Sequence, residues 1–211
     1  MDISKEIEEV LLKHQGLVYH LESNSLSGEL FLPHGDSYDL IIKLEPYPKF
    51  FPWVYEVGGR IPIKMDRHIY TDTGSCCFTT AAKSQILLKT KITSLIKFID
   101  EIVVRYFENN SYYEINRTYY YDEYDHGSRG VVQSYQDILE ISDTKSIGRL
   151  MLQRLQNKKL TIRDLCYCNS GQSLKKCSYG SHCYNYRLFR MIDKDVLYND
   201  LKHFKNVLKI K

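Results

Sequence analysis

The stretch SGELFLPHGDSYDLIIKLEPYPKFFPWVYEV, residues 27–57, decides the fold of the amino-terminal part of the chain. Its short apolar runs are interrupted by Gly, Pro, His and Asp, the pattern of strands joined by turns. Pro46, Pro48 and Pro52 cannot donate ladder hydrogen bonds, so we expect a rigid connection before a last strand, WVYEV. Together with GLVYHLE at 16–22, the stretch predicts a meander of four antiparallel strands.

Two amphipathic helices flank the predicted meander. Residues 2–15 place apolar side chains at helical spacing, and residues 86–107 do so over a longer run. We expect the second helix to begin near Thr90 and to end before the Asn-Asn pair at 109–110. Residues 60–84 follow neither the helix nor the strand period. Irregular stretches of this length inside a compact domain are usually functional.

The carboxyl-terminal third shows shorter helical patterns and a cysteine cluster. VVQSYQDILEI at 131–141 predicts a short helix, and KSIGRLMLQRLQNKKL at 145–160 predicts a basic helix that joins two units. We therefore divide the chain into a domain at 1–150 and a helical linker with a small cysteine-rich appendage at 151–211. A length of 211 residues suits one domain and an appendage.

Composition narrows the class of protein. Hydrophobic residues at 43% and charged residues at 26% are ordinary for a globular protein, and no stretch approaches the roughly 18 apolar residues of a membrane span. The amino terminus is acidic and amphipathic, unlike a secretory signal, so we expect a cytoplasmic protein without membrane association. A net charge of +3 is too small to indicate nucleic-acid binding by itself, and tyrosines serve cores and interfaces more often than base stacking.

The six cysteines fall into two groups, which differ in spacing. One group is an adjacent pair and the other a cluster: Cys76 and Cys77, then Cys166, Cys168, Cys177 and Cys183. In a chain without an export signal, such clustering indicates a metal site in one group and reactive or buried thiols in the other.

The order of helix, four-stranded meander, proline-rich turn, long cysteine segment and long helix resembles the ubiquitin-conjugating enzymes. YPKFFPWV at 47–54 is similar to the tyrosine-proline turn of that family. GSCCF at 74–78 is similar to the Gly-x-Ile-Cys-Leu string that bears the catalytic cysteine. The resemblance implies an α+β, ubiquitin-conjugating-enzyme-like fold, with Cys77 at the catalytic position and Cys76 at the neighbouring apolar one.

Another part of the resemblance concerns the residues that precede the cysteine. The family has a His-Pro-Asn tripeptide some ten residues upstream, and His68, Ile69 and Tyr70 stand at a spacing one residue shorter. His68 can fix the segment by hydrogen bonds or be a partly exposed histidine. The family's asparagine can donate to an oxyanion or hold the loop, and Tyr70 can supply a hydroxyl in its place.

DHGSRGVVQSYQDIL at 125–139 resembles a feature of bacterial relatives of the family, which accompany ubiquitin-like modifiers and activating enzymes in antiphage defence operons. His126 within it can lie near the cysteine and orient or deprotonate an incoming amine, or it can be a turn residue. Asp122 and Asp125 are weaker candidates for the same role.

The resemblance implies an enzyme that takes a ubiquitin-like modifier from an activating enzyme as a Cys77 thioester and passes it to an amine of a target protein. No nearby histidine is obligatory, because the thiol attacks an already activated thioester. Alternatively, Cys76 and Cys77 are both buried hydrophobes, although strand-like alternation would point one inward and one outward. Two other functions stay open: an inactive variant that binds the modifier as a scaffold, and a zinc-stapled protein that binds nucleic acid or ribosomes.

The cluster Cys166-Tyr-Cys168, followed by eight residues and Cys177, resembles the SEC-C zinc motif, including its Ser-Gly turn and lysine pair. In that motif the fourth ligand directly follows the third. The resemblance therefore implies structural zinc in this part of the chain.

The fourth ligand must come from elsewhere, because Ser178 stands at the position after Cys177 and serine is a poor zinc ligand. Either His182 or Cys183 completes the tetrahedron, and we favour Cys183. A site closed by four protein ligands organises a fold rather than catalyses a reaction. Basic residues near the cluster indicate a docking surface: Lys175, Lys176, Arg187 and Arg190.

Overall fold

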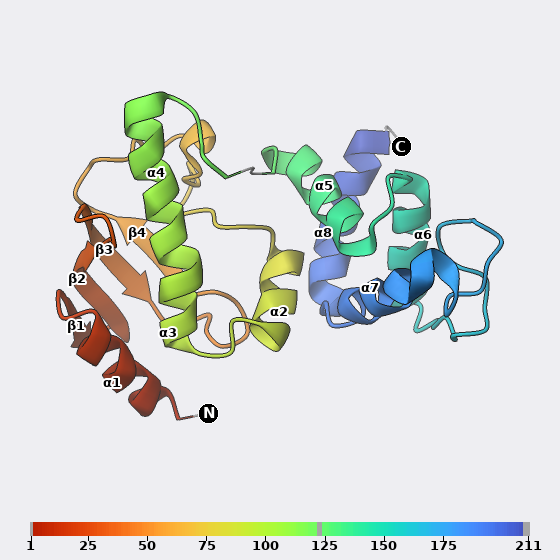
Figure 1. Cartoon of the computed structure of the whole chain (residues 1–211), viewed down its shortest axis with the longest axis horizontal. Coiled ribbons are helices and arrows are strands. Elements are labelled where there is room, and N and C mark those ends of the chain that lie inside the picture. The colour runs from red at the N-terminus through yellow and green to blue at the C-terminus, as the bar shows by residue number, and fades with distance from the viewer. Residues whose placement is uncertain (1, 122–123, 209–211) are drawn as a thin grey trace. The chain divides into compact units, whose positions relative to one another are not determined.

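The computed structural model describes residues 2–121 and 124–208 of an α+β protein with a four-stranded antiparallel sheet. The chain divides into two compact units (Figure 1). Within the described residues, the first unit comprises 2–79 and 87–121, and the second comprises 80–86 and 124–208. Asp122 lies outside the described residues.

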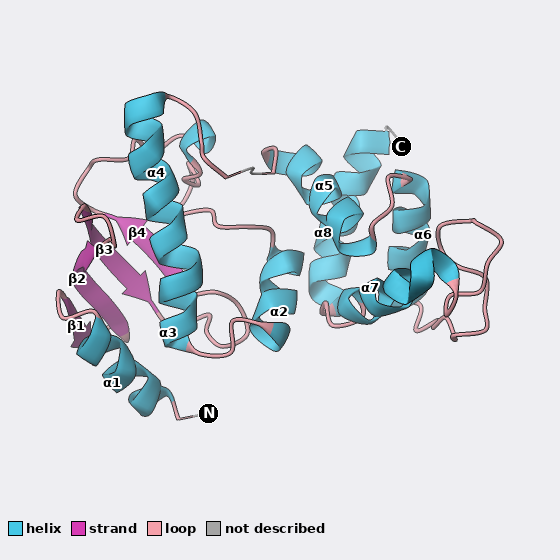
Figure 2. Cartoon of the chain, viewed as in Figure 1, coloured by secondary structure: helices cyan, strands magenta, loops and turns pink. Residues whose placement is uncertain are grey.

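The first unit contains the sheet and the helices that cover it (Figure 2). Its helices are α1 (Ile3–Lys13), α3 (Leu95–Phe98) and α4 (Val104–Asn116), the last two joined by a π-helical turn at Ile99–Val103. Its strands are β1 (Leu17–His20), β2 (Ser25–Phe31), β3 (Ser37–Lys43) and β4 (Trp53–Glu56).

The strands pair in chain order, β1-β2-β3-β4, and each is antiparallel to its neighbour. The predicted meander is therefore confirmed. Along β3, Leu40 and Ile42 are buried whereas Asp39 and Lys43 are exposed, because successive side chains of a strand point to opposite faces. One face of the sheet thus belongs to the core.

The buried face of the sheet packs against the long helix α3–α4 (Figure 1). The ring of Tyr38 on β3 lies 4.5 Å from that of Phe107 on α4, and Phe51 lies 4.9 Å from Phe98 on α3. Each fully buried side chain of this size contributes roughly 1.5–3 kcal/mol. The sheet and the long helix therefore form one core, which fixes the segment between them.

The long helix begins and ends later than the sequence pattern indicates. It begins at Leu95, where the side chain of the N-cap residue Ser94 accepts from the Lys97 amide, and it ends at Asn116. Asn109 lies inside the helix because its side chain accepts from the Tyr120 and Tyr121 amides. Tertiary hydrogen bonds thus keep an asparagine inside the helix that local propensity would place at its end.

A separate helix, α2 (Ala81–Thr90), begins inside the predicted irregular segment 60–84 and takes up the first residues of the helical pattern at 86–107. Its first half belongs to the second unit. Gln85 is fully buried there and exchanges two hydrogen bonds with Asp193, of 2.9 Å from its side-chain amide and 2.8 Å to its side-chain oxygen. Lys83 pairs with Asp137, which fixes the same turn of α2. Tertiary contacts therefore stabilise a helix with weak amphipathicity.

The second unit contains further helices and an irregular segment (Figure 2). The helices are α5 (Gly127–Leu139), α6 (Thr144–Leu155), α7 (Ser181–Phe189) and α8 (Lys194–Leu208). The predicted domain boundary after residue 150 lies within α6, whereas the units divide between the described residues 121 and 124. The basic helix expected to join two units instead packs inside the second one.

The second unit has its own core, made by α5, α6, α7 and α8. Tyr135 of α5 is fully buried against the rings of Phe189 and Phe204, and its hydroxyl donates to Asp200 at 2.9 Å. The irregular segment lies between α6 and α7, so this core fixes both of its ends. Across the residues that the structure describes, no helix is long and apolar enough to cross a membrane.

Candidate metal centre and cysteine segment

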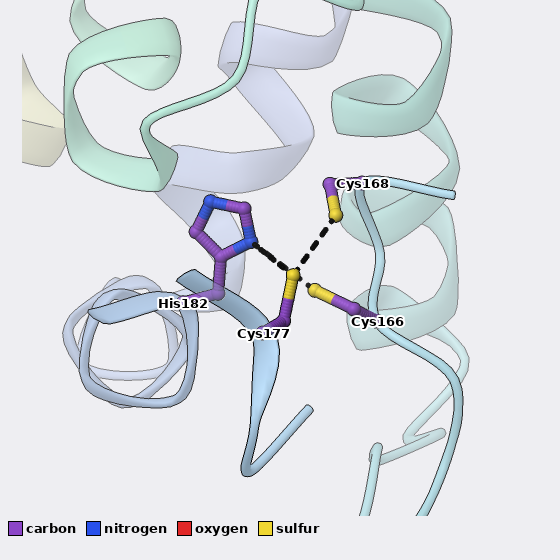
Figure 3. Close-up of side chains that lie close together, drawn as sticks. All are labelled: Cys166, Cys168, Cys177 and His182. Atoms are coloured by element: carbon purple, nitrogen blue, oxygen red, sulfur yellow. Dashed lines mark hydrogen bonds between the residues drawn. The ribbon is translucent and has the colours of Figure 1, made fainter. Parts of the chain in front are cut away.

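Four side chains of the second unit converge on one point (Figure 3): Cys166, Cys168, Cys177 and His182. Cys166 and Cys168 come from the irregular segment after α6, Cys177 begins a short 3-10 turn at Cys177–Gly180, and His182 lies in the first turn of α7. Their ligand atoms all lie within 4.8 Å of one another. Three sulfur atoms and one imidazole nitrogen form a donor set typical of structural zinc.

The distances between ligand atoms suit a tetrahedral ion. Cys168 Sγ lies 3.4 Å from Cys177 Sγ, and His182 Nδ1 lies 3.2 Å from Cys166 Sγ and 3.3 Å from Cys177 Sγ. Zinc with bonds of about 2.3 Å to sulfur and about 2.0 Å to nitrogen separates such atoms by roughly 3.5–3.8 Å. These three separations lie within a few tenths of an ångström of the zinc values, and every separation in the set is at most 4.8 Å.

Backbone hydrogen bonds build the turn that carries the three cysteines. Leu165 and Ser173 form an isolated antiparallel bridge, and the Cys166 amide donates to the Gln172 carbonyl at 2.8 Å. Gly171 adopts a left-handed conformation that closes the turn between them. The Cys177 amide then donates to the Ser173 carbonyl, at 3.0 Å. The turn thus places the first and third cysteines side by side.

Further contacts orient the histidine ligand. Its ring stacks on Tyr167 with 5.0 Å between centroids, and the Tyr167 hydroxyl donates to the carbonyls of Leu139 and His182. The other ring nitrogen, Nε2, lies 3.3 Å from Ser178 Oγ. With Nδ1 on the metal, Nε2 carries the proton and donates to this hydroxyl. Ser178 would therefore accept a hydrogen bond from His182 rather than bind the metal itself.

Two thiols of the cluster have pKa values that are shifted in opposite directions. Burial raises the pKa of Cys166 to about 12. Burial also opposes ionisation of Cys168, but hydrogen bonds from Ser170 and Cys177 outweigh it and lower the pKa of Cys168 to about 6. A metal ion takes all its cysteine ligands as thiolates, so its binding releases the protons that the cluster holds.

The structure corrects the expected fourth ligand from Cys183 to His182. The two residues are adjacent on α7, so their side chains point in directions about 100° apart. His182 is buried toward the three sulfur atoms, whereas Cys183 lines a separate hollow with Leu160 and Tyr186. The direction in which α7 begins therefore decides that His182, and not Cys183, faces the three sulfur atoms.

The second candidate site is the adjacent cysteine pair in the first unit. The Cys76 amide donates to the Val54 carbonyl of β4 at 2.8 Å, and the Cys77 amide donates to the His68 carbonyl at 2.7 Å. Cys76 also forms an isolated antiparallel bridge with Ile69. These extended contacts turn the two side chains to opposite sides.

The two thiols consequently have different environments. Cys76 is 6% exposed in the core, and burial raises its pKa to about 12 against a hydrogen bond from Tyr106. Cys77 is only half-buried. The hydroxyl of Tyr70 contacts the Cys77 thiol, and burial, then the charge and hydrogen bonding of Cys77, raise the pKa of Tyr70. One residue of the pair is therefore structural, and the other meets the surface.

Side chains of α4 hold the segment that precedes the cysteine pair. The Tyr106 hydroxyl donates to the carbonyls of Arg67 and His68, at 3.2 Å and 3.0 Å. Arg67 is 7% exposed; its guanidinium donates to Asn110 at 2.9 Å and lies 4.2 Å above the Tyr113 ring. These supports were not among the residues predicted from the sequence, because nothing in their spacing relates them to the cysteine.

His68 is one of the predicted residues that the structure places beside Cys77. Its backbone is left-handed, and its ring lies edge-on to Tyr119 with 5.3 Å between centroids. Its carbonyl, rather than its ring, accepts the hydrogen bond from the Cys77 amide. The fixing role expected of His68 therefore rests on backbone geometry.

His126 belongs to the second unit, where it is the exposed N-cap residue of α5. The neighbouring Asp125 exchanges hydrogen bonds with Gln133, accepting from its side-chain amide and donating its own backbone amide. Asp125 and His126 therefore both lie at the N-terminal end of α5. The catalytic role of His126 stays a prediction.

Comparisons of the chain with models of known protein families, with curated proteins and with solved structures give no match.

Proposed function

We propose that the first unit is a ubiquitin-conjugating-type domain that carries a ubiquitin-like modifier as a thioester on Cys77. The observation that carries the proposal is the division of the cysteine pair. Cys76 is buried in the core, whereas Cys77 is only partly buried in an irregular segment next to β4. A bulky acyl donor needs a thiol in such a place.

The order of elements supports the same proposal. Helix α1, the meander β1-β2-β3-β4, the cysteine segment and the long helix α3–α4 follow each other as the resemblance implies. The segment is also fixed, because its backbone is bonded to β4 and to Tyr106 of α4. A nucleophile held this way is oriented before the substrate arrives.

The proposed chemistry consists of two acyl transfers. The Cys77 sulfur attacks the thioester carbonyl of the modifier; the new carbon–sulfur bond forms as the thiol of the activating enzyme leaves and takes up the proton. A target amine then attacks the same carbonyl; a carbon–nitrogen bond forms, the carbon–sulfur bond to Cys77 breaks, and the departing sulfur takes up the proton that the amine loses. The activating enzyme supplies the energy by consuming ATP.

Tyr70 is the proposed donor to the oxyanion of these steps. It stands where the family has asparagine, and its hydroxyl contacts the Cys77 thiol. A phenol of ordinary pKa is already protonated at neutral pH, and the raised pKa of Tyr70 leaves it so; the hydroxyl can therefore donate a hydrogen bond. The role proposed for His126 is to orient or deprotonate the incoming amine.

The second unit supplies structural zinc in this proposal. The donor set Cys166, Cys168, Cys177 and His182 fits the ion, and its binding free energy stabilises a segment without regular secondary structure. The metal site and the carrier cysteine thus have separate roles.

Incubation of the full chain with modifier, activating enzyme and ATP tests the carrier role. Intact-mass measurement is expected to show an adduct that thiol reagents remove and that Cys77→Ala abolishes. The Cys76→Ala variant is the matched control and keeps the adduct. An adduct that persists in Cys77→Ala would refute the assignment.

The replacement of the family's asparagine by Tyr70 favours a second candidate function, an inactive variant that binds the modifier as a scaffold. The same experiment separates the two functions. A scaffold binds the modifier without forming a reducible adduct, and Cys77→Ala leaves that binding unchanged.

A further inference from the structure

The second unit has a hollow of ≈ 460 Å³ beside α7, which we call the α7 groove. Its floor is apolar and comes from two parts of the irregular segment and from α7: Leu160, Ile162, Leu174, Cys183 and Tyr186. Leu174 and Tyr186 are buried, and the Tyr186 hydroxyl bonds the Leu160 amide at 2.9 Å. The groove therefore has a fixed floor.

One face of α7 builds the groove wall. Cys183, Tyr186, Arg187 and Arg190 are three, four and seven positions apart, so they share one side of the helix. His182 points away from this side to the metal centre. A metal bound there would fix the first turn of α7 and, with it, the groove wall.

Three cations lie around the apolar floor: Lys159, Arg187 and Arg190. The lining includes no acidic residue. Within residues 2–121 and 124–208, none of these three cations forms an ion pair with a carboxylate. Three cations without partners around an apolar hollow complement a ligand that carries an apolar group between negative charges.

We propose that the α7 groove binds an acidic peptide segment, in which one aliphatic or aromatic side chain enters the hollow and flanking Asp or Glu residues pair with Lys159, Arg187 and Arg190. Arginine is the side chain that most favours carboxylates at interfaces, because its guanidinium bonds both oxygens. This binding function is separate from the carrier role of Cys77 and does not depend on it.

The floor disfavours nucleic acid as the occupant. Binding of single strands without sequence preference uses aromatic rings exposed for base stacking. The aromatic residue of this floor, Tyr186, is 6% exposed and uses its hydroxyl to bond the Leu160 amide. An apolar side chain of a peptide suits such a floor better than a base.

Fluorescence anisotropy with the zinc-loaded full chain tests the proposal. The probe is a fluorescein-labelled nonapeptide with a central Leu and four Glu residues on each side. We expect saturable binding that weakens at least about tenfold when the central Leu is replaced by Ser, and at least about tenfold with the double variant Arg187→Glu, Arg190→Glu. Arg163→Glu, an exposed change outside the groove, serves as the matched control and keeps most of the affinity.

Zinc content and circular dichroism of each variant separate loss of binding from loss of folding. If the double variant loses zinc, the single exposed change Arg187→Ala takes its place, with an expected loss of at least about threefold. Absence of saturable binding, equal binding of the Leu and Ser peptides, or an equal loss in Arg163→Glu would overturn the proposal. Tighter binding of a single-stranded uridine octamer, lost in the same variants, would overturn it in favour of nucleic acid.

Discussion

Two irregular segments of this chain carry cysteines, and the protein fixes them by different means. Residues 57–79 of the first unit are held by backbone bonds to β4 and by side chains of α4. Residues 156–180 of the second unit fold around three sulfur atoms and His182. The first segment leaves one cysteine partly exposed, whereas the second turns three thiols toward His182. The difference teaches that several donor side chains must point to one place before neighbouring cysteines can hold a metal ion.

The largest effect is expected from the removal of a candidate metal ligand of the second segment. Structural zinc in small domains contributes about 10–16 kcal/mol of folding free energy, so Cys177→Ala should abolish zinc binding and unfold residues 156–180. Zinc content by mass spectrometry and hydrogen exchange of the segment measure the change. Cys183→Ala is the control and should keep a full complement of zinc. Zinc loss in Cys183→Ala would reinstate that residue as the fourth ligand.

Alkylation of the cysteine pair should separate the two thiols by a rate ratio of at least about a hundredfold at pH 8. Cys76 is buried with a pKa near 12, so almost none of it is thiolate at that pH, and a reagent reaches Cys77 first. Peptide mass spectrometry after iodoacetamide treatment of the zinc-loaded protein gives the rates. Similar rates for both residues would show that the segment opens and that its two sides are not distinct.

Arg67→Ala should destabilise the first unit by about 3 kcal/mol, because it removes a buried charged hydrogen bond to Asn110 and leaves a cavity under Tyr113. Urea unfolding followed by the fluorescence of Trp53, the one tryptophan of the chain, reports on this unit. Arg105→Ala is the control: Arg105 is exposed and lies 4.7 Å above the Tyr121 ring, so a loss of about 0.5 kcal/mol is expected.

We expect acid to lower the free energy of unfolding of the first unit by about 1 kcal/mol, because it weakens the ion pairs of Arg60. Arg60 pairs with Asp36 at 2.7 Å and with Glu114 at 2.7 Å, and the hydrogen bond from Arg60 is the main cause that lowers the pKa of Asp36. Because the folded pKa lies below the unfolded value, the pair stabilises above about pH 4 and is lost as pH falls through the folded pKa.

The comparison of urea midpoints at pH 6 and pH 3 tests this acid effect, again with Trp53 fluorescence. Asp36→Asn should make the first unit less sensitive to acid, whereas the exposed Glu9→Gln on α1 should leave the sensitivity unchanged. An unchanged acid response in Asp36→Asn would mean that the ion pair does not hold the segment.

Local pattern was sufficient to predict the sheet and much of the candidate metal site. Alternating apolar positions and the prolines before Trp53 predicted the four strands, since both act over a few residues. The spacing of Cys166, Cys168 and Cys177 predicted three ligands for the same reason. The split of the cysteine pair followed from strand-like alternation.

Tertiary contacts explain what the sequence pattern missed. Helix α2 depends on pairing of Lys83 and Gln85 with distant residues. Asn109 stays inside α4 because amides of the following loop bond its side chain. His182, rather than Cys183, faces the three sulfur atoms because of the direction in which α7 starts. The local sequence pattern does not reveal that direction. Long-range contacts of this kind have no period to detect.

The extended backbone at Cys76 and Cys77 makes the chemistry of the first unit sensitive to chain length. Insertion of a single residue between Gly74 and Cys76 would rotate every following side chain to the other side of the segment. The sulfur now in the interior would then meet solvent, and its neighbour would be withdrawn. Chains with such an insertion or deletion are therefore expected to have their partly exposed cysteine shifted by one position.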